Sequence, residues 1–168
     1  MQQENGFFEA ASRAAVQYFH RLGILKQEAE TAEAGEVLFL QDVTAFVQMN
    51  GGITGGFLFT LEEGLARELA KRYMLDAITD EEADQYATEV VAEITNVIAG
   101  NALTECEIQG VYMGTPLTLV ARNAEIRSKC RSKMRHASYI TDYGKLQLLY
   151  IPAENKAELA SILAIRPA

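Results

Sequence analysis

Two side chains of complementary chemistry lie three residues apart in the middle of the chain. Glu93 carries a carboxylate and Asn96 a carboxamide, and the amide can both accept and donate hydrogen bonds. In a helix, residues i and i+3 are neighbours on one face, so both groups can act on a single target. The pair is a candidate catalytic site; periodicity alone also allows the plainer interpretation of two solvated helix residues.

The same helical face carries two further candidates for contact with a partner. At about 100° per residue, Glu89 and Gly100 fall on the stripe of Glu93 and Asn96, beside the predicted core face. A glycine inside a helix costs about 1 kcal/mol relative to alanine, and its missing side chain would let another surface approach closely. The predicted core face consists of Ala87, Val90, Val91, Ile94, Val97 and Ile98.

Helix start signals place this stripe on the longest predicted helix. The segment Thr79–Glu82 has the T-x-x-E form of a capping box, and the helical pattern runs from there to about Cys106. The same form at Thr60–Glu63 predicts a helix to about Met74. Apolar residues at helical spacing predict an amphipathic helix over residues 7–26.

The remaining segments have the patterns of strands and turns. Asn50-Gly51-Gly52 predicts a hairpin turn, and residues 27–35 read as a small acidic linker. The predicted strands cover residues 37–40, 43–49, 53–60, 117–121, 125–141 and 145–151, and a short helix is predicted over 153–164. Because helices and strands do not alternate strictly, this order predicts an α/β (α+β-like) fold with a mixed, largely antiparallel sheet.

Other catalytic and metal-binding patterns are absent from the sequence. No H-E-x-x-H, C-x-x-C, G-x-S-x-G or acidic calcium loop occurs. Gly51–Gly56 lacks the Lys-Ser/Thr ending of a phosphate loop and precedes a strand, so it is interpreted as a hairpin turn. His20 and His136 have no ligand-spaced companions, and Cys106 and Cys130 are interpreted as reduced, small buried thiols. We expect no metal and no cofactor in this chain, and no self-contained hydrolase of a common class.

Composition limits the class of protein. The 168 residues, 49% hydrophobic and 23% charged, fit one globular domain over 1–168. The net charge of −8 argues against a general nucleic-acid binder. No apolar run reaches the roughly 20 residues of a membrane span, and the first residues lack a signal-peptide pattern. We therefore expect a cytoplasmic protein that binds neither nucleic acid nor a membrane.

Charge is distributed unevenly along the chain. Residues 1–121 hold 6 basic and 19 acidic side chains, whereas residues 122–168 hold 9 basic and 4 acidic ones. Most of the basic excess lies in one run: Arg122, Arg127, Lys129, Arg131, Lys133 and Arg135. The run is either a solvated strand face whose charges discourage edge pairing or a patch for an acidic partner.

The central helix resembles a known motif. Residues 93–102, E-I-T-N-V-I-A-G-N-A, look like the central motif of the CheC/CheX/FliY chemotaxis phosphatases, and most like that of CheX. The flanking order is similar too: an amphipathic first helix, a hairpin through Phe46–Gly51 and Gly55–Phe59, and the acidic helix start Asp80–Glu82. The resemblance implies a CheX-like domain whose long amphipathic helices pack on one face of the sheet.

By this resemblance, the chain is a phosphatase acting on the aspartyl phosphate of a CheY-like response regulator. Asn96 would orient the attacking water, and Glu93 would pair with the regulator's phosphate-site lysine; the Mg²⁺ ion would belong to the regulator. In-line attack on an acyl phosphate mainly needs a positioned water and neutralised charge. The alternative is a non-catalytic module of the same fold that binds a response regulator or a motor component.

Differences from the family concern the number of sites and the edge of the sheet. CheC-type members carry a second site, but the first helix here has Glu9-Ala10-Ala11-Ser12, with serine in place of asparagine. One site per chain is therefore expected, in a homodimer. The basic run 127–136 and the extension 153–168 depart from the family pattern and leave the dimer contact open.

Overall fold

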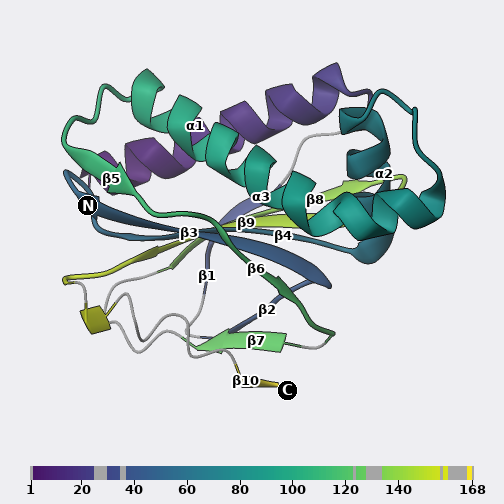
Figure 1. The fold of residues 1–168 in the computed structure, drawn as a ribbon. Coiled ribbons are helices and arrows are strands. Elements are labelled where there is room, and N and C mark those ends of the chain that lie inside the picture. Colours follow the sequence, from purple (N-terminus) through teal and green to yellow (C-terminus); the bar gives the residue numbers. More distant parts are fainter. Residues whose placement is uncertain are drawn as a thin grey trace.

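Helices α1, α2 and α3 lie on one face of a seven-stranded sheet, and a small three-stranded sheet lies on its other side (Figure 1). The structure is a computed structural model that describes residues 2–24, 30–34, 37–122, 124–127, 134–155, 157–158 and 166–167. All strand pairs within these ranges are antiparallel. The predicted fold class is confirmed.

The large sheet has the strand order β1-β8-β9-β4-β3-β5, and β6 also pairs with β3. Its strands are β1 (Glu30–Ala34), β3 (Val43–Gly51), β4 (Gly55–Leu61), β5 (Val111–Met113), β6 (Leu117–Val120), β8 (Met134–Thr141) and β9 (Gly144–Pro152). The small sheet consists of β2 (Val37–Phe39), β7 (Ala124–Arg127) and β10 (Arg166–Pro167). The hairpin of β3 and β4 lies near the middle, and β5 and β6 follow one another along the outer side of β3.

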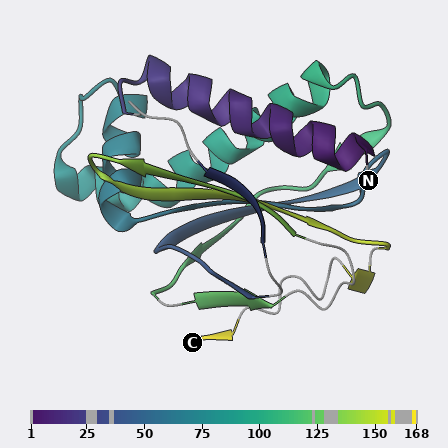
Figure 2. The same ribbon diagram turned by 180° about the vertical axis from the view of Figure 1, so that it is seen from behind.

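The helices form a single layer above the large sheet. Helix α1 (Gln2–Arg21) and helix α3 (Asp80–Glu105) run side by side, and the shorter α2 (Glu63–Tyr73) covers one end. Seen from behind, α1 lies in front of α3 (Figure 2). Because α3 contacts α1, α2 and the sheet, its outer face remains the part that a partner can reach.

The main core lies between the helices and the sheet and is rich in aromatic rings. Phe7 and Phe19 of α1 meet Phe57, Phe59 and Tyr150 of the sheet, with ring centroids 5.5 to 5.8 Å apart. Such ring pairs contribute about 0.5–1.5 kcal/mol each beyond the burial of their area. They fix α1 on the sheet and thereby fix one flank of α3.

A second, smaller core lies between the large and the small sheet. It contains Leu40, Phe46, Leu58, Ala124, Ile126, Met134, Leu149, Ile151 and Ala153. Alternate residues of β3, β4 and β9 therefore face two different cores. This explains why these strands read as continuous apolar runs and not as an apolar–polar alternation.

The glycine-rich segment is a hairpin turn, as predicted. Gly51 has a φ of 118°, and a Cβ there would lie 1.9 Å from the carbonyl oxygen of Gly110. The Gly52 amide donates a hydrogen bond to the same oxygen at 3.1 Å. Only glycine allows this approach, so the segment serves backbone packing.

The helix predicted from Thr60 begins later, and the capping role of Thr60 is wrong. Thr60 is the buried penultimate residue of β4. Its Oγ1 accepts hydrogen bonds from the Thr44 hydroxyl and from the backbone amide of Gln41, both at 2.8 Å. Strand pairing with β9 holds Thr60 in the sheet. Helix α2 instead starts at Glu63, whose backbone amide donates to Asp42 Oδ2 at 2.9 Å.

Three short strands were not predicted, and several predictions lie outside the described residues. The acidic linker 27–35 contains β1, which pairs with β8; β5 pairs with β3 after Gly110, and β10 pairs with β7. Strand β1 lacks the apolar pattern that identifies a strand, and β5 and β10 are only three and two residues long. Residues 128–133 of the basic run, the side chain of Arg127, Cys130 and most of the helix predicted over 153–164 are not described.

Candidate functional site

The helix that carries the candidate site is anchored at its start. Thr79 and Glu82 form the predicted capping box: Thr79 Oγ1 accepts from the Glu82 amide at 3.3 Å, and Glu82 Oε2 accepts from the Thr79 amide at 2.8 Å. Asp80 pairs with Lys71 at 2.7 Å, and Asp84 with Arg67 at 2.6 Å. Acidic groups also favour the positive end of the helix dipole. Helix α3 is therefore fixed against α2 where it begins.

Five of the six residues predicted for the core face of α3 are buried, and the exception is Val97. The buried residues of α3 are Ala83, Ala87, Val90, Val91, Ile94, Thr95, Ile98, Ala99 and Ala102.

 Ala99 and Thr95 are buried although the sequence did not place them on the core face, because α1 packs against that side of α3. Val97 was placed on the core face, and this is wrong: its side chain is 37% exposed. The core arc is thus turned toward α1, and Val97 lies at the border of the outer stripe.

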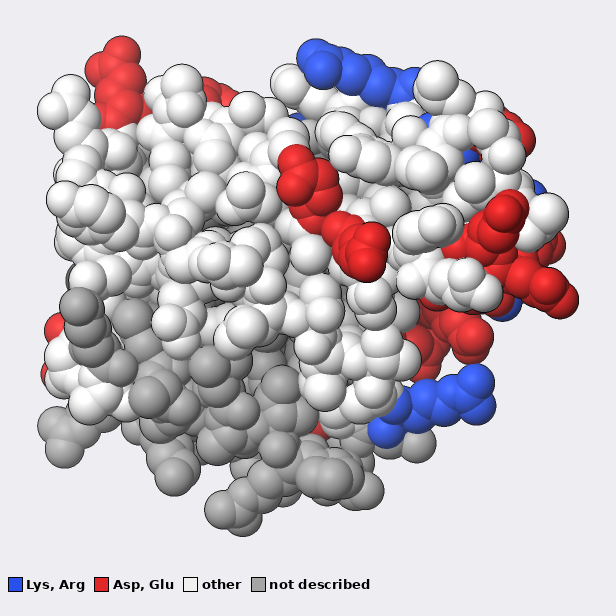
Figure 3. All heavy atoms as spheres, viewed as in Figure 1, with Lys and Arg blue, Asp and Glu red and all other residues white. Residues whose placement is uncertain are grey.

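The four predicted site residues lie together on the outer face of α3. Glu89 and Glu93 are exposed, and Asn96 and Gly100 are partly exposed, so none of the four is used to fill the core. In Figure 3, acidic side chains lie over the middle of α3 within a largely uncharged surface. A carboxylate and an amide one helical turn apart are therefore presented to a partner on a rigid helix.

Gly100 leaves open space beside this pair. A Cβ at Gly100 would meet only Met113 Cε within 4 Å, at 4.0 Å, which is an ordinary contact. The packing of this chain therefore does not require a glycine at this position. The space is consistent with the predicted close approach of another surface.

Tyr18 of α1 is a neighbour of the site that the sequence did not single out. Burial raises the pKa of its phenol, and the charges of Tyr73 and Glu93 raise it further. The phenol of Tyr18 is therefore influenced by one residue at the end of α2 and by the acidic residue of the candidate pair. Its place in the apolar repeat of the first helix identified it only as a core residue.

The first helix does not present a second site of the same kind. Glu9 is exposed, but Ser12 is buried and faces the interior. Its hydroxyl is thus unable to reach a partner across the outer surface. This agrees with the expectation of one site per chain.

Other chemistry finds little support in the described part of the chain. Burial is the main cause that raises the pKa of the Cys106 thiol, and the neighbouring Glu105 raises it further, so this thiol is not activated as a nucleophile. Within the described ranges, no group of three or more His, Cys, Asp or Glu side chains could hold a metal ion. No helix among these residues is long and apolar enough to cross a membrane.

Sequence comparison assigns the family. The family model of the chemotaxis phosphatase CheX matches residues 43–140, from the central hairpin through α3 to β8. The chain belongs to the CheX family. The predicted membership is confirmed, and the match includes both residues of the candidate pair. No curated protein sequence matches the chain.

Solved structures share the fold of this CheX-family chain at low sequence identity. A chemotaxis protein CheX from Desulfovibrio desulfuricans has a TM-score of 0.70 at 21% identity, with 91% of this chain and 100% of that chain covered. The CheX-CheY-BeF3-Mg+2 complex from Borrelia burgdorferi gives a TM-score of 0.59 at 21% identity, with 88% and 95% covered. FliY from Thermotoga maritima gives 0.55 at 15% identity, with 96% and 95% covered.

Proposed function

We propose that this chain hydrolyses the aspartyl phosphate of a CheY-like response regulator. The observation that carries the proposal is the pair of an exposed Glu93 and a partly exposed Asn96, one turn apart on the outer face of α3 in a CheX-family chain. The complex of a CheX with a CheY supports a receiver protein as the partner. The reaction transfers the phosphoryl group from the aspartyl oxygen to water and releases inorganic phosphate.

Asn96 is the residue proposed to act on water. Its amide oxygen accepts a hydrogen bond from the attacking water, and its amide nitrogen donates one to an oxygen of the partner. The buried face of α3 and the capped start of the helix hold its backbone in place. A positioned water needs little further activation, because the acyl phosphate is already a reactive species.

Glu93 is proposed to bind the regulator by pairing with the lysine of its phosphate site. The carboxylate is exposed on the outer face of α3 and has no basic residue paired with it among the described ion pairs. A cation from outside the chain is thus able to bind it. Glu89, one turn earlier, extends the acidic contact, and Gly100 lets the partner's backbone approach.

The Mg²⁺ ion of this reaction is proposed to belong to the regulator. In this proposal the carboxylate of Glu93 binds the regulator's lysine, so it is not available as a ligand for Mg²⁺. When bound in the regulator, the ion neutralises charge on the phosphoryl group. This chain supplies the water-positioning amide and the docking carboxylate.

The alternative function is a module that binds a regulator or a motor component without hydrolysis. The partly exposed amide of Asn96 favours catalysis, because docking alone does not require an amide at this point. The two functions differ in one measurement: phosphate release from a phosphorylated CheY-like protein with and without this chain. We expect faster release with the chain; binding with an unchanged rate of release would support the module.

A further inference from the structure

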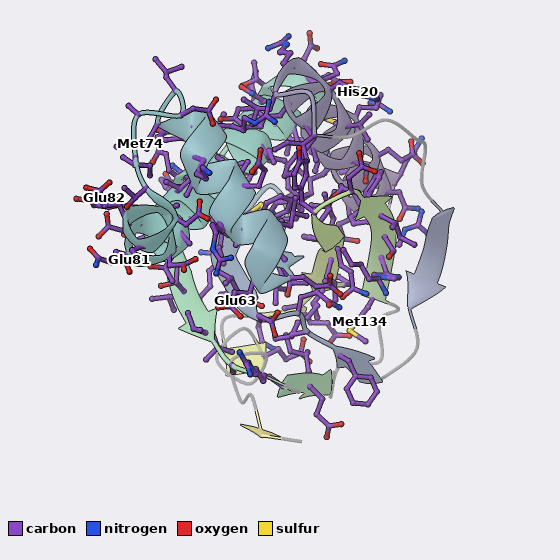
Figure 4. The ribbon with its side chains drawn as sticks, turned by 90° about the vertical axis from the view of Figure 1, so that its right-hand side faces the viewer. His20, Glu63, Met74, Glu81, Glu82 and Met134 are labelled. Carbon is purple, nitrogen blue, oxygen red and sulfur yellow. The ribbon has the colours of Figure 1, made fainter. Side chains whose placement is uncertain are left out.

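The connection between α2 and α3 exposes three consecutive apolar side chains. Tyr73 and Met74 are exposed, and Leu75 is 87% exposed. Figure 4 shows Met74 on the outer side of this connection, near the start of α3 where Glu81 and Glu82 lie. Apolar side chains gathered on an outer turn are typical of an interaction surface.

The backbone of this turn is unusual for its sequence. Leu75 and Asp76 have φ values of 56° and 55°, in the left-handed region that glycine and asparagine adopt most easily. Hydrogen bonds from the Leu75 amide to the Arg72 oxygen at 3.2 Å and from the Asp76 amide to the Lys71 oxygen at 2.8 Å hold the turn. Leu75 accepts this conformation although its side chain packs on almost nothing within the chain. The fold therefore gives no reason for a leucine here.

The turn lies beside the candidate site. Arg72 Nη1 donates to the Leu22 carbonyl oxygen at 3.2 Å, which holds the end of α2 against the end of α1. The start of α3, next to this turn, lies about 20 Å along the helix axis from Glu93, a separation that fits within one contact face. The charges of Tyr73 and Glu93 also raise the pKa of Tyr18 on the neighbouring α1. The apolar turn and the Glu93–Asn96 pair are thus two parts of one outer surface of the helical layer.

We propose that the segment Tyr73–Asp76 is the apolar half of the docking surface for the response regulator, with Leu75 in contact with apolar side chains of the regulator. This inference rests on the proposed function. A stable contact covers about 800 Å² on each partner, far more than two side chains of α3 provide. Exposed ion pairs, such as the one proposed between Glu93 and the regulator's lysine, contribute little affinity by themselves. An apolar contact next to this pair is therefore needed to hold the partner.

The decisive variant is Leu75→Asn. Asparagine fits the left-handed backbone better than leucine, so the melting temperature should stay the same or rise. Binding to a CheY-like regulator held in its active form with beryllium fluoride and Mg²⁺ should weaken about tenfold, the loss typical of a contact residue at an interface centre. At saturating phosphorylated regulator, turnover should stay near that of the wild type. Leu75→Met, which keeps an apolar side chain, should bind the regulator with nearly wild-type affinity.

Ile140→Asn is the matched control. Ile140 is 79% exposed, but it alternates on β8 with Tyr139 of the main core and so faces away from the helices. Its variant should bind as the wild type does. If Leu75→Asn binds the regulator with wild-type affinity and hydrolysis is normal, this inference alone is overturned. It is also overturned if the free Leu75→Asn chain has a lower mass than the free wild type, because Leu75 would then contact a second copy. Failure of the wild-type chain to bind or hydrolyse any CheY-like regulator would overturn the proposed function as well.

Discussion

Asn96 is the residue on which catalysis depends in the proposed mechanism. Replacing it with alanine removes the group that positions water, an interaction that gains its full value only as the transition state forms. We expect Asn96→Ala to lower turnover by on the order of 10²-fold or more, with the affinity for the regulator nearly unchanged. Single-turnover phosphate release and a separate binding titration distinguish the two effects.

Glu93→Gln provides the contrast to this variant. It should weaken binding, because the lysine of the regulator loses its charged partner, and it slows turnover only if that lysine also neutralises the phosphoryl group. Both positions lie outside the buried face of α3, so neither melting temperature should fall. Wild-type hydrolysis by Asn96→Ala would refute the catalytic assignment and favour the binding module.

Gly100 tests whether the partner approaches the helix closely. Alanine at this position should raise the free energy of unfolding by up to about 1 kcal/mol, since a Cβ would meet only Met113 Cε at an ordinary 4.0 Å. The same Cβ should weaken binding of the regulator if the partner's surface lies against the glycine. A more stable variant with unchanged affinity would show that the regulator does not contact Gly100.

At this scale the sequence predicted the placement of Glu93 and Asn96 on α3 better than it predicted their neighbours; their roles stay a prediction. Glu93 and Asn96 could be paired because the helical period alone places residues i and i+3 on one face. Val97 was misplaced and Tyr18 was missed because both depend on where α1 lies against α3. That packing is a tertiary contact, and the pattern of a single helix does not contain it.

Among the elements, two identical start signals had opposite outcomes. The T-x-x-E segment at Thr79 caps α3, whereas the one at Thr60 lies at the end of β4. Thr60 is held by strand pairing and by two hydrogen bonds to its Oγ1, which a local pattern does not reveal. Strand β1 was not predicted for a related reason: it is identified only by its pairing with β8, which the local sequence pattern does not reveal.

Strand β8 carries a histidine that makes stability depend on pH. Burial is the main cause that lowers the pKa of His136, and the charge of Lys145 lowers it further; no partner of its Nε2 is found among the described residues. The unfolded chain therefore binds this proton more readily than the folded chain. The contribution of His136 is fully present above its ordinary pKa of 6.5 and is lost as pH falls through the lowered value.

Denaturant unfolding measured between about pH 7.5 and pH 5 checks this expectation. The free energy of unfolding of the wild type should decrease toward low pH, and His136→Gln should reduce the decrease. His20→Gln, which removes an imidazole from the exposed end of α1, is the matched control. An unchanged slope in His136→Gln would show that other groups cause the pH dependence.

For the whole molecule, the exposed edge of the large sheet predicts association. Strand β6 pairs with β3 on one side only among the described strands, and its sequence Leu117–Val120 contains no charge. Val120 is 65% exposed. Natural edge strands usually carry charges or proline that prevent pairing. Strand β1, at the other edge, has Glu30 and Glu33, whereas β6 has neither a charged residue nor a proline.

We therefore expect a homodimer in which β6 or the face beside it meets its copy across a two-fold axis. Light scattering at micromolar concentration should give about twice the chain mass of 18.5 kDa. Val120→Lys should shift the mass toward the monomer, because two lysines would meet across the axis, whereas Ile140→Lys, at an even more exposed site on β8, should not. A wild-type mass of 18.5 kDa would contradict the dimer. Because β6 lies beside α3 but the Glu93–Asn96 pair faces outward, the dimer should leave one open regulator site on each chain, and titration should give one regulator bound per chain.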